Sequence, residues 1–441
     1  MRRKLGKAAH MMSDSAEPDL PVHDLVGVGF GPSNLGLAIA AAEHDGLVAR
    51  FVERQERFGW HRGMLLQDAT MQISYLKDLV TMRNPASPYG FLSYLHARDR
   101  LADFINYGSA FPTRLEFHDY LEWVAAGFAD RVDYGCEVAA IEPVTGEAGL
   151  LDVRTGDGRV LRTRNVVLAT GLVPQLPDGV RASERVWHSR DLLPGTEAVR
   201  AGGSSPRRVV VIGAGQSAAE ALDHLHRTFT DAQVCAVFAR YGYSPADDSA
   251  FANRVFDPAA VDDFFRAPAD VKDAILGYHA NTNYSVVDPG LIESLYRTHY
   301  HERVSGRERL EFRNVSRVAD AVETDDGVEL AVESLIDGAR DVLSADLVVY
   351  ATGYRPADPC GLLGDLAARC LRDADGRLDI RRDYRVATDP TITAGIYVQG
   401  ATEHTHGLSS TLLSNVAVRS GEIAASVAAA VRSGDLAATR S

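Results

Sequence analysis

Cysteine is scarce in this 441-residue sequence, which has four, and no two of them are spaced as a CxxC pair. A redox-active dithiol and a zinc or iron–sulfur site both need closely spaced cysteines, so the sequence predicts neither, and no bound metal. We therefore expect four structural thiols in a reducing compartment: Cys136, Cys235, Cys360 and Cys370.

Long hydrophobic runs and an excess of positive charge are also missing. No apolar run approaches the ~20 residues that a membrane-spanning helix needs, and the basic N-terminus lacks the apolar segment of a secretory signal. The formal net charge of −14 disfavours a broad nucleic-acid-binding surface. We expect a cytoplasmic protein without membrane or nucleic-acid partners, with a disordered arm at residues 1–21 and a disordered tail at 433–441.

Strand and helix signals alternate along the chain, which favours an α/β fold. Helical spacing occurs at residues 117–129 and 417–431, and the Gly- and Ser-rich stretch 201–208 indicates a linker. Short apolar runs rich in β-branched residues are typical of buried parallel strands, and they occur at residues 23–29, 50–54, 164–171, 207–215, 232–240 and 346–353.

The stretch DLVGVGFGPSNLGLAIA, which begins at Asp24, is typical of a dinucleotide-binding loop between a strand and a helix. Gly27 and Gly29 form a GxG pair, and Pro32 stands where a third glycine or alanine is usual. Such glycines let the backbone approach a pyrophosphate, and the following helix offers free N–H groups. Glu53 ends the next apolar run, as an acid that binds a ribose hydroxyl does.

The same pattern recurs in VVVIGAGQSAAEAL, which contains Gly213 and Gly215. Here the next apolar run ends in Arg240, 25 positions after Gly215, and no acid is present. An arginine at this place favours the 2′-phosphate of NADP over the free ribose of NAD. The alternative is a surface arginine at a strand end.

Two further apolar runs end in the triplet Ala-Thr-Gly, each downstream of one nucleotide loop. A glycine that ends a buried strand lets the backbone pass close to a cofactor. Together with the two loops, the triplets indicate a flavoprotein with FAD in the first site and NADPH in the second. The candidate contacts are Thr170 and Gly171 for FAD, and Ala351, Thr352 and Gly353 for NADP.

This pattern predicts a two-dinucleotide-binding-domain flavoprotein in which one Rossmann-like domain is inserted into another. We expect an FAD-binding domain made of residues 22–200 and 346–432, the second part closing over flavin and substrate. The inserted NADPH-binding domain is expected at 205–345, with a helical substrate-binding segment near residues 246–300.

Six motifs carry the strongest functional signal. They are WHRGMLLQDATMQISYLKDLVTMRNPASPYGFLSYL (60–95), GAGQSAAE (213–220), DDSAFANRVFDP (247–258), NTNYSVVD (281–288), ATGY (351–354) and EHTHGLSSTLLSNVAVRSGEI (403–423). In these, and over nearly all of residues 22–430, the chain resembles the microbial N-hydroxylating flavin monooxygenases, most closely the L-ornithine N5-monooxygenases of siderophore and related hydroxamate biosynthesis. It lacks the FxGxxxHxxxW signature of flavin-containing and Baeyer–Villiger monooxygenases.

The resemblance implies that NADPH reduces FAD and that reduced flavin takes up molecular oxygen as a C4a-hydroperoxyflavin. The neutral side-chain amine of L-ornithine then attacks the distal oxygen, giving N5-hydroxy-L-ornithine. Such a site must exclude water to prevent loss of peroxide. The resemblance also implies a homo-oligomer, often a tetramer.

The matched motifs imply roles for individual residues. Lys77 is expected to pair with the substrate carboxylate, and Asn253 and Asn283 to hold the amino-acid end, with Asn253 supporting catalysis and Asn283 also reaching NADP. Ser410 is expected near the flavin and the substrate, with Ser409 as its rival. The remaining expected contacts are Trp60, His61, Gln72 and Leu408 at the flavin, with Gln72 also bordering the substrate, and Gln216 and Ser217 at NADP. Taken singly, Lys77 could be a solvated lysine, the asparagines could cap turns, and His61 could be an interior histidine.

Other functions stay open on the sequence. Hydroxylation of L-lysine or of a diamine differs in chemistry only by the substrate, and one methylene is worth ~1–3 kcal/mol of discrimination. Lys77 disfavours a diamine, which has no carboxylate to pair with it. An NADP-sensing flavoprotein would have no use for an amino-acid pocket, and an NADPH:quinone reductase would form no hydroxylamine.

Overall fold

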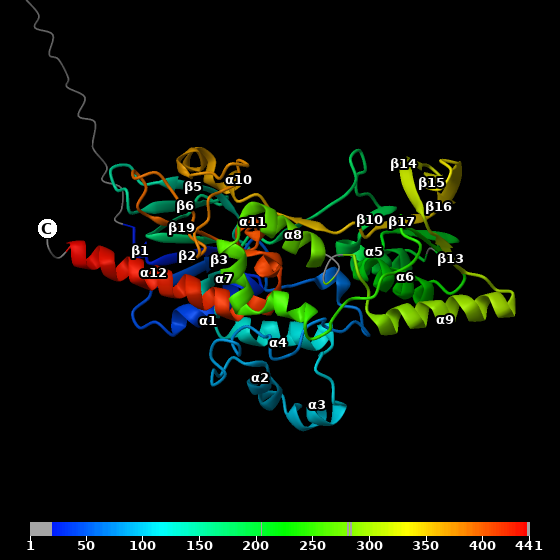
Figure 1. Ribbon diagram of the computed structural model, residues 1–441, viewed down its shortest axis with the longest axis horizontal. Helices are drawn as coiled ribbons and strands as arrows, with labels where there is room; N and C mark the ends of the chain where they lie inside the picture. Colours follow the sequence, from blue (N-terminus) through cyan, green and yellow to red (C-terminus); the bar gives the residue numbers. More distant parts are fainter. Residues whose placement is uncertain (1–19, 204, 280–281, 283–284, 439–441) are drawn as a thin grey trace, which may run out of the picture.

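The computed structural model describes residues 20–438, apart from residues 204, 280, 281, 283 and 284. Two α/β units lie side by side, and helices α7 (Pro258–Arg266) and α8 (Ala269–His279) appear between them in this view (Figure 1). The first unit contains the first glycine loop and the C-terminal helix, and the second unit contains the second glycine loop. Within the described part of the chain, no helix is long and apolar enough to cross a membrane.

The first unit is built on a parallel sheet whose two faces are covered differently. One face packs against helices α1 (Pro32–Ala42), α4 (Arg114–Ala126) and α12 (Val416–Ala438), and the other packs against a second sheet. The parallel sheet has the order β19-β8-β2-β3-β4, with bounds Gly395–Val398, Asn165–Leu168, Leu25–Val28, Ala49–Val52 and Val132–Asp133. The covering sheet has the order β1-β7-β6-β5, with bounds Val22–His23, Val160–Thr163, Leu151–Thr155 and Val138–Pro143.

The second unit repeats this plan. Its parallel sheet has the order β10-β17-β11-β12-β13, with bounds Val186–His188, Leu347–Tyr350, Arg208–Ile212, Gln233–Val237 and Leu310–Arg313. One face carries α5 (Leu192–Ala201), α6 (Gln216–Thr228) and α9 (Pro289–Ser305). An antiparallel sheet covers the other face, with β14 (Ser316–Thr324), β15 (Gly327–Ser334) and β16 (Arg340–Ala345).

Short elements complete the fold and connect the units. The antiparallel pair β9 (Leu172–Pro174) and β18 (Tyr354–Pro356) joins the two crossings between units. Helix α7 contacts α11, which brings the inserted segment against the first unit. The other helices are α2 (Phe91–Ala97), α3 (Leu101–Tyr107), α7 (Pro258–Arg266), α8 (Ala269–His279), α10 (Cys360–Leu363) and α11 (Glu403–His406).

All six apolar runs contain the predicted strands, each in a parallel sheet, and both predicted helices are present as α4 and α12. Two expectations need correction. The expected NADPH-domain bounds, 205–345, miss β10 and β17, because both pair into the sheet of the second unit, and β14–β16 form their own sheet there. The tail expected to be disordered from residue 433 continues helix α12 to Ala438.

Candidate active site

The two glycine loops are structurally equivalent, and their hydrogen bonds define how they correspond. The Gly29 amide donates to the Val52 carbonyl at 2.8 Å, and the Gly213 amide donates to the Val237 carbonyl at 3.1 Å. Both glycines have positive φ, and a Cβ on either would lie 2.5 Å from a carbonyl oxygen, that of Ala169 for Gly29 and that of Ala351 for Gly213. Only glycine fits these two places, where a turn passes against the start of an Ala-Thr-Gly triplet.

This correspondence corrects the expected position of the first loop. Gly27 lies inside β2, where it packs against the Phe51 ring, and the loop glycines are Gly29 and Gly31. Pro32 is the first residue of α1, and the third fingerprint position is Asn34. The buried Asn34 amide donates to the Gly29 carbonyl at 2.7 Å, so a side chain braces this loop from within.

Both loops end at helix N-termini that fit an anionic ligand. Gly31 caps α1 and Gly215 caps α6, and neither has a side chain that binds the first amides of the helix. The free N–H groups and the helix dipole favour a pyrophosphate at each place. Apart from its neighbours in the chain, no atom of the described residues lies within 4 Å of a Cβ built on Gly31, so the space beside this loop is open to a dinucleotide.

Replacing Gly31 with alanine is expected to weaken FAD binding about ten-fold, the effect of ~1.4 kcal/mol, without unfolding the protein. The φ of −82° suits alanine and the new methyl group meets no protein atom, so only a bound dinucleotide can resist it. FAD titration of the apoprotein, with thermal unfolding alongside, measures both effects. Gly46 is the matched control outside the loop, since a Cβ there also meets nothing, although its φ of 80° will cost some stability. Unchanged FAD affinity in Gly31→Ala would place the pyrophosphate elsewhere.

The acid and the arginine expected at the two riboses do not occupy equivalent positions. Because Val52 corresponds to Val237, Glu53 corresponds to Phe238, and Arg240 lies two residues further on. Glu53 is buried and accepts from the Phe30 amide at 2.7 Å. Arg240 donates to the Ser285 carbonyl at 2.7 Å and to Ser244 at 3.4 Å. The second site therefore has no acid at the ribose position, and its arginine approaches from the neighbouring turn.

The two Ala-Thr-Gly turns are joined reciprocally. The Ala357 amide donates to the Gly171 carbonyl at 3.1 Å, and the Gln175 amide donates to the Gly353 carbonyl at 3.0 Å. The Thr352 hydroxyl also donates to the Gln175 carbonyl. These bonds lie at both ends of the β9–β18 pair, so the turns expected to pass close to the two cofactors also hold the two units together.

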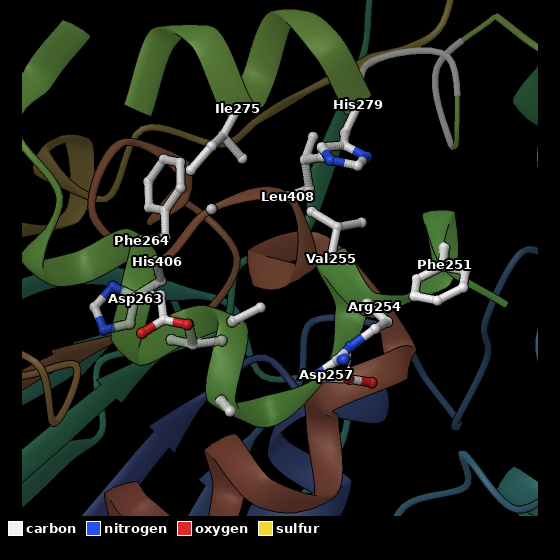
Figure 2. A pocket seen from close by; sticks show the side chains of 14 residues that line it. Phe251, Arg254, Val255, Asp257, Asp263, Phe264, Ile275, His279, His406 and Leu408 are labelled. Atoms are coloured by element: carbon white, nitrogen blue, oxygen red, sulfur yellow. Dashed lines mark ion pairs between the residues drawn. The ribbon is translucent and has the colours of Figure 1, made fainter. Parts of the chain in front are cut away.

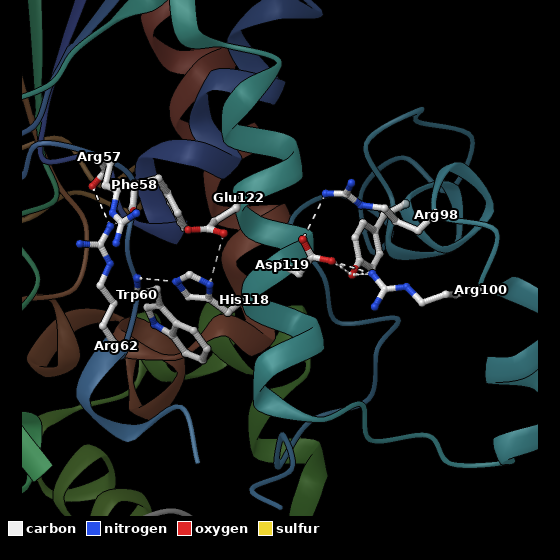
Figure 3. Close-up of polar contacts among 10 residues, drawn as sticks. Arg57, Phe58, Trp60, Arg62, Arg98, Arg100, His118, Asp119 and Glu122 are labelled. Carbon is white, nitrogen blue, oxygen red and sulfur yellow. Dashed lines mark hydrogen bonds and ion pairs between the residues drawn. The ribbon is translucent and has the colours of Figure 1, made fainter. Parts of the chain in front are cut away.

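Trp60 belongs to a segment that side chains hold in place beside α4. The Trp60 amide donates to Nε2 of His118 at 3.4 Å, and Arg62 donates to the carbonyls of Arg57 and Phe58 (Figure 3). On the other side of α4, Figure 3 shows Asp119 bound to two arginines from the α2–α3 region. Helix α4 is thus fixed on both sides, and it provides a rigid support for the expected flavin-lining segment.

His61 lies between the rings of Trp60 and Tyr354. Its ring makes edge contacts with Trp60 at 4.7 Å and with Tyr354 at 6.2 Å, between ring centres. Solvent reaches the side chain, yet desolvation by the surrounding protein, with a smaller contribution from Arg114, lowers its pKa to about 4. A pKa of about 4 leaves His61 neutral at pH 7.

Three segments that the sequence singled out for the substrate come together. The Lys77 ammonium lies 5.9 Å from the centre of the Phe256 ring, at the end of the short helix Ala252–Phe256 that contains Asn253. That helix contacts the turn Leu408–Thr411, which contains Ser409 and Ser410. Gln72 is exposed on the same loop as Lys77, and Asn283 lies outside the described residues.

The two serines of this turn differ in their partners. The Ser409 hydroxyl accepts from the amide of Asn415 at 3.1 Å. The Ser410 hydroxyl is buried and has no hydrogen-bond partner, and the Asn415 side-chain oxygen is in the same condition. Buried polar atoms usually have a partner, so these two oxygens are available to a ligand or an ordered water. Leu408 and both serines are almost fully buried, so this turn is closed to bulk solvent.

A buried ion pair that sequence reasoning missed crosses between the units. Arg114, at the start of α4, binds both carboxylate oxygens of Glu220 on α6, at 2.8 and 2.9 Å. Glu220 also accepts from Gln216 at 2.9 Å, and Gln216 accepts from the Asp288 amide at 2.8 Å. The expected NADP contact Gln216 is thus connected to the first unit, whereas Ser217 is only half-buried beside it. Arg114 and Glu220 lie 106 positions apart, and no local pattern links them.

A cavity of about 320 Å³ opens beside the substrate segments (Figure 2). It lies between α7, α8 and the 406–408 turn, and its lining includes Phe251, Arg254, Phe264, Ile275, His406 and Leu408. It touches the flanks of Asn253 and the flavin-side residue Leu408, but Lys77, Asn253 and Ser410 do not line it. The cavity therefore adjoins the predicted substrate residues without containing them.

These observations define a class of protein. The chain has two equivalent strand–glycine–helix loops, one with an acid and one without, and polar atoms are left unpaired near the first. This is the arrangement of a flavoprotein with FAD and NADPH sites in one chain. Residues 21–356 match the model of the family described as L-lysine 6-monooxygenase/L-ornithine 5-monooxygenase. The chain belongs to this family, and it is an NADPH-dependent flavin monooxygenase.

Similar proteins agree on the class. The chain is 44% identical to an L-ornithine N(5)-monooxygenase of Burkholderia cepacia over 88% of this chain and 90% of that protein. The ornithine N-hydroxylase of Kutzneria sp. 744, solved with reduced FAD, NADP⁺ and L-ornithine, is 50% identical, with a TM-score of 0.89 over 92% of this chain and 99% of that one. Ornithine hydroxylase of Pseudomonas aeruginosa is 40% identical, with a TM-score of 0.87 over 93% of this chain and 100% of that one.

Proposed function

We propose that this enzyme hydroxylates the side-chain amine of L-ornithine to give N5-hydroxy-L-ornithine for hydroxamate siderophores or related products. The observation that carries the proposal is the convergence of Lys77, the Asn253 helix and the Ser410 turn next to the expected flavin position. A substrate with a carboxylate, an α-ammonium and a distal amine needs a cation, an acceptor and an enclosed apolar end, and these segments offer all three.

Bound FAD, reduced by NADPH, supplies the oxygen chemistry, and the chain positions and protects the reactants. Lys77 holds the carboxylate, which fixes the direction in which the side chain of ornithine extends. The buried Leu408–Thr411 turn excludes water from the end where the amine reacts. At the second site, the amides that follow Gly215 bind the pyrophosphate, and Arg240 binds the 2′-phosphate.

Asn253 has a more specific role in this proposal. Its amide nitrogen donates to the carbonyls of Asp248 at 2.7 Å and Ser249 at 3.3 Å, which uses both of its N–H groups. Its side-chain oxygen is what it offers a ligand, so Asn253 accepts from the α-ammonium and leaves the carboxylate to Lys77.

Asn253→Ala is therefore expected to raise the KM for ornithine about ten-fold, the effect of one hydrogen bond to a charged group, ~1.5 kcal/mol. The same variant should leave the KM for 5-aminopentanoate unchanged, because that analogue keeps the carboxylate and the amine but lacks the α-ammonium. Steady-state hydroxylamine assays with both compounds measure the difference. An equal loss for both compounds would mean that Asn253 only shapes the loop.

The substrate itself is tested by comparing L-ornithine, L-lysine and putrescine in an assay of hydroxylated product. We expect hydroxyornithine to dominate, because the longer side chain of lysine moves the amine while Lys77 holds the carboxylate, and putrescine has no carboxylate for Lys77 to hold. If hydroxylysine were the main product, the enzyme would instead have the L-lysine 6-monooxygenase activity that is also named for the family.

We further propose that the enzyme acts in the cytoplasm, where NADPH is supplied, and as a homo-oligomer, which sedimentation analysis would test.

A further inference from the structure

A fully buried cation that the proposed reaction does not use lies between the first glycine loop and the Ser409–Ser410 turn. Arg419 stands in the first turn of α12, and 3% of it is exposed. Among the residues that the structure describes, no carboxylate lies within ion-pair distance of its guanidinium. Burial lowers its pKa, as expected for a charge removed from water.

The position of Arg419 is unfavourable for a positive charge in two ways, so the charge needs a compensating interaction there. Burying a charge without a counter-ion destabilises a protein unless another partner compensates it. A positive charge in the first turn of a helix also opposes the helix dipole. Its hydrogen-bond partners are all neutral. The Glu422 carboxylate acts on it only through space and is itself bound by Arg382, so the guanidinium has no direct counter-ion.

These partners join two parts of the expected FAD site. The guanidinium donates to the carbonyls of Ser409 at 3.2 Å and Ser410 at 2.8 Å. It also donates to the Ser33 hydroxyl at 3.3 Å, in the first turn of α1, and to the side-chain oxygen of Gln399 at 3.2 Å. One cation therefore holds both the turn with the unpaired Ser410 hydroxyl and the helix end that is expected to bind the pyrophosphate.

Gln399 extends the connection into the glycine loop. Its amide donates to the Asn34 side-chain oxygen at 3.1 Å, and the amide of Asn34 binds the Gly29 carbonyl. The path from Arg419 through Gln399 and Asn34 to Gly29 is made of buried side chains. A shift of the guanidinium would therefore displace both the glycine loop and the Ser409–Ser410 turn.

We propose that Arg419 is a positioning residue that ties the first glycine loop to the Ser409–Ser410 turn. We further infer that its positive charge, which lacks a direct counter-ion, favours the anionic pyrophosphate and the reduced, anionic state of the flavin over the oxidised state. The inference rests on the proposed placement of FAD beside these residues, but it is independent of which amine is hydroxylated.

The test compares Arg419→Lys, which keeps the charge but loses the planar set of donors, with Arg419→Gln, which loses the charge. The readouts are the FAD dissociation constant and the two-electron reduction potential. We expect Arg419→Gln to bind FAD at least ten-fold more weakly. Reduced FAD should lose a further ten-fold relative to oxidised FAD, which lowers the potential by about 30 mV. Arg419→Lys should weaken FAD binding but keep the potential near that of the parent.

Arg385 provides the matched control, because it too donates to two backbone carbonyls, those of Thr393 and Ala394, but it contacts none of the partners of Arg419. Arg385→Gln should change neither readout. If Arg419→Gln does not fold, Gln399→Leu and Arg419→Lys are compared instead. Gln399→Leu removes the hydrogen bonds between Arg419 and Asn34 but keeps the cation, so it should weaken FAD binding without changing the reduction potential.

If Arg419→Lys and Gln399→Leu bound FAD as tightly as the wild-type enzyme does, the positioning role would be overturned. The charge effect would be overturned if Arg419→Gln had the same two-electron reduction potential as the wild-type enzyme. It would also be overturned if Arg419→Lys shifted the potential as much as Arg419→Gln does. Both readouts are independent of ornithine turnover. An enzyme that binds FAD as expected but hydroxylates no amine would therefore contradict the proposed function and leave this inference standing.

Discussion

Replacing Arg114 with alanine is expected to slow flavin reduction by NADPH about 100-fold while FAD stays bound. The exposed fractions of the side chains are 12% for Arg114 and 5% for Glu220, so the substitution leaves a buried carboxylate without its partner. Breaking a buried pair costs about 3–5 kcal/mol, and ~2.8 kcal/mol shifts a population 100-fold. Because the pair joins α4 to α6, the arrangement that brings the second site to the flavin becomes the minor one. Stopped-flow flavin absorbance measures the rate.

A second ion pair on α6 provides the matched control. Arg227 binds Asp68 at 2.6 Å, but both side chains are more than half exposed, so Arg227→Ala should change the reduction rate less than two-fold. The double variant Arg114→Met with Glu220→Leu removes both charges and should recover much of the rate, because no unpaired charge remains buried. A parental reduction rate in Arg114→Ala would contradict the coupling of the two units through this pair.

Replacing Lys77 with methionine is expected to raise the KM for ornithine about 100-fold, with flavin reduction by NADPH little changed. In the proposed function the lost interaction joins the Lys77 ammonium to the substrate carboxylate, and charge-assisted hydrogen bonds are worth ~1.5–3 kcal/mol. Methionine keeps the length and apolar stem of the side chain but loses the ammonium that lies over the Phe256 ring, so the loss reports the charge. Steady-state hydroxylamine formation at varied ornithine measures KM and kcat separately.

Lys272 is the control for Lys77, since it also lies over aromatic rings, those of Phe264 and Phe265, but on helix α8. Lys272→Met should leave the KM for ornithine within two-fold of the parent. Lys77→Arg should recover part of the affinity, because it restores a cation at a slightly different reach. A Lys77→Met enzyme with the parental KM would place the substrate carboxylate elsewhere.

Local patterns predicted the architecture well, because strands and glycine turns leave short-range signals. The two loops, the parallel strands and the triplets at their ends are all visible in stretches of about ten residues. The same patterns do not locate a strand end to within two residues, which is why Gly27 was assigned to the loop that Gly29 and Gly31 form. Only the hydrogen bonds to Val52 and Val237 establish the correspondence and separate Arg240 from the position of Glu53.

Contacts between distant positions could not be predicted in this way. Arg114 and Glu220 belong to separate units, and Arg419 meets Ser33 across 386 positions. In the sequence, Arg114 and Arg419 are single charged residues near the start of a helix, where a side chain is ordinarily solvated. Their burial depends on how whole layers pack, and this information is spread over the cores of both units.

The central claim is that two dinucleotide sites in one chain serve one N-hydroxylation, and product analysis with ¹⁸O₂ tests it most directly. Purified, FAD-loaded enzyme is given NADPH, L-ornithine and labelled oxygen, and NADPH consumption is compared with labelled product. The account predicts one ¹⁸O atom on the side-chain nitrogen of ornithine for nearly every NADPH consumed. Consumption of NADPH that yields only peroxide, with ornithine and with every other amine tested, would contradict it.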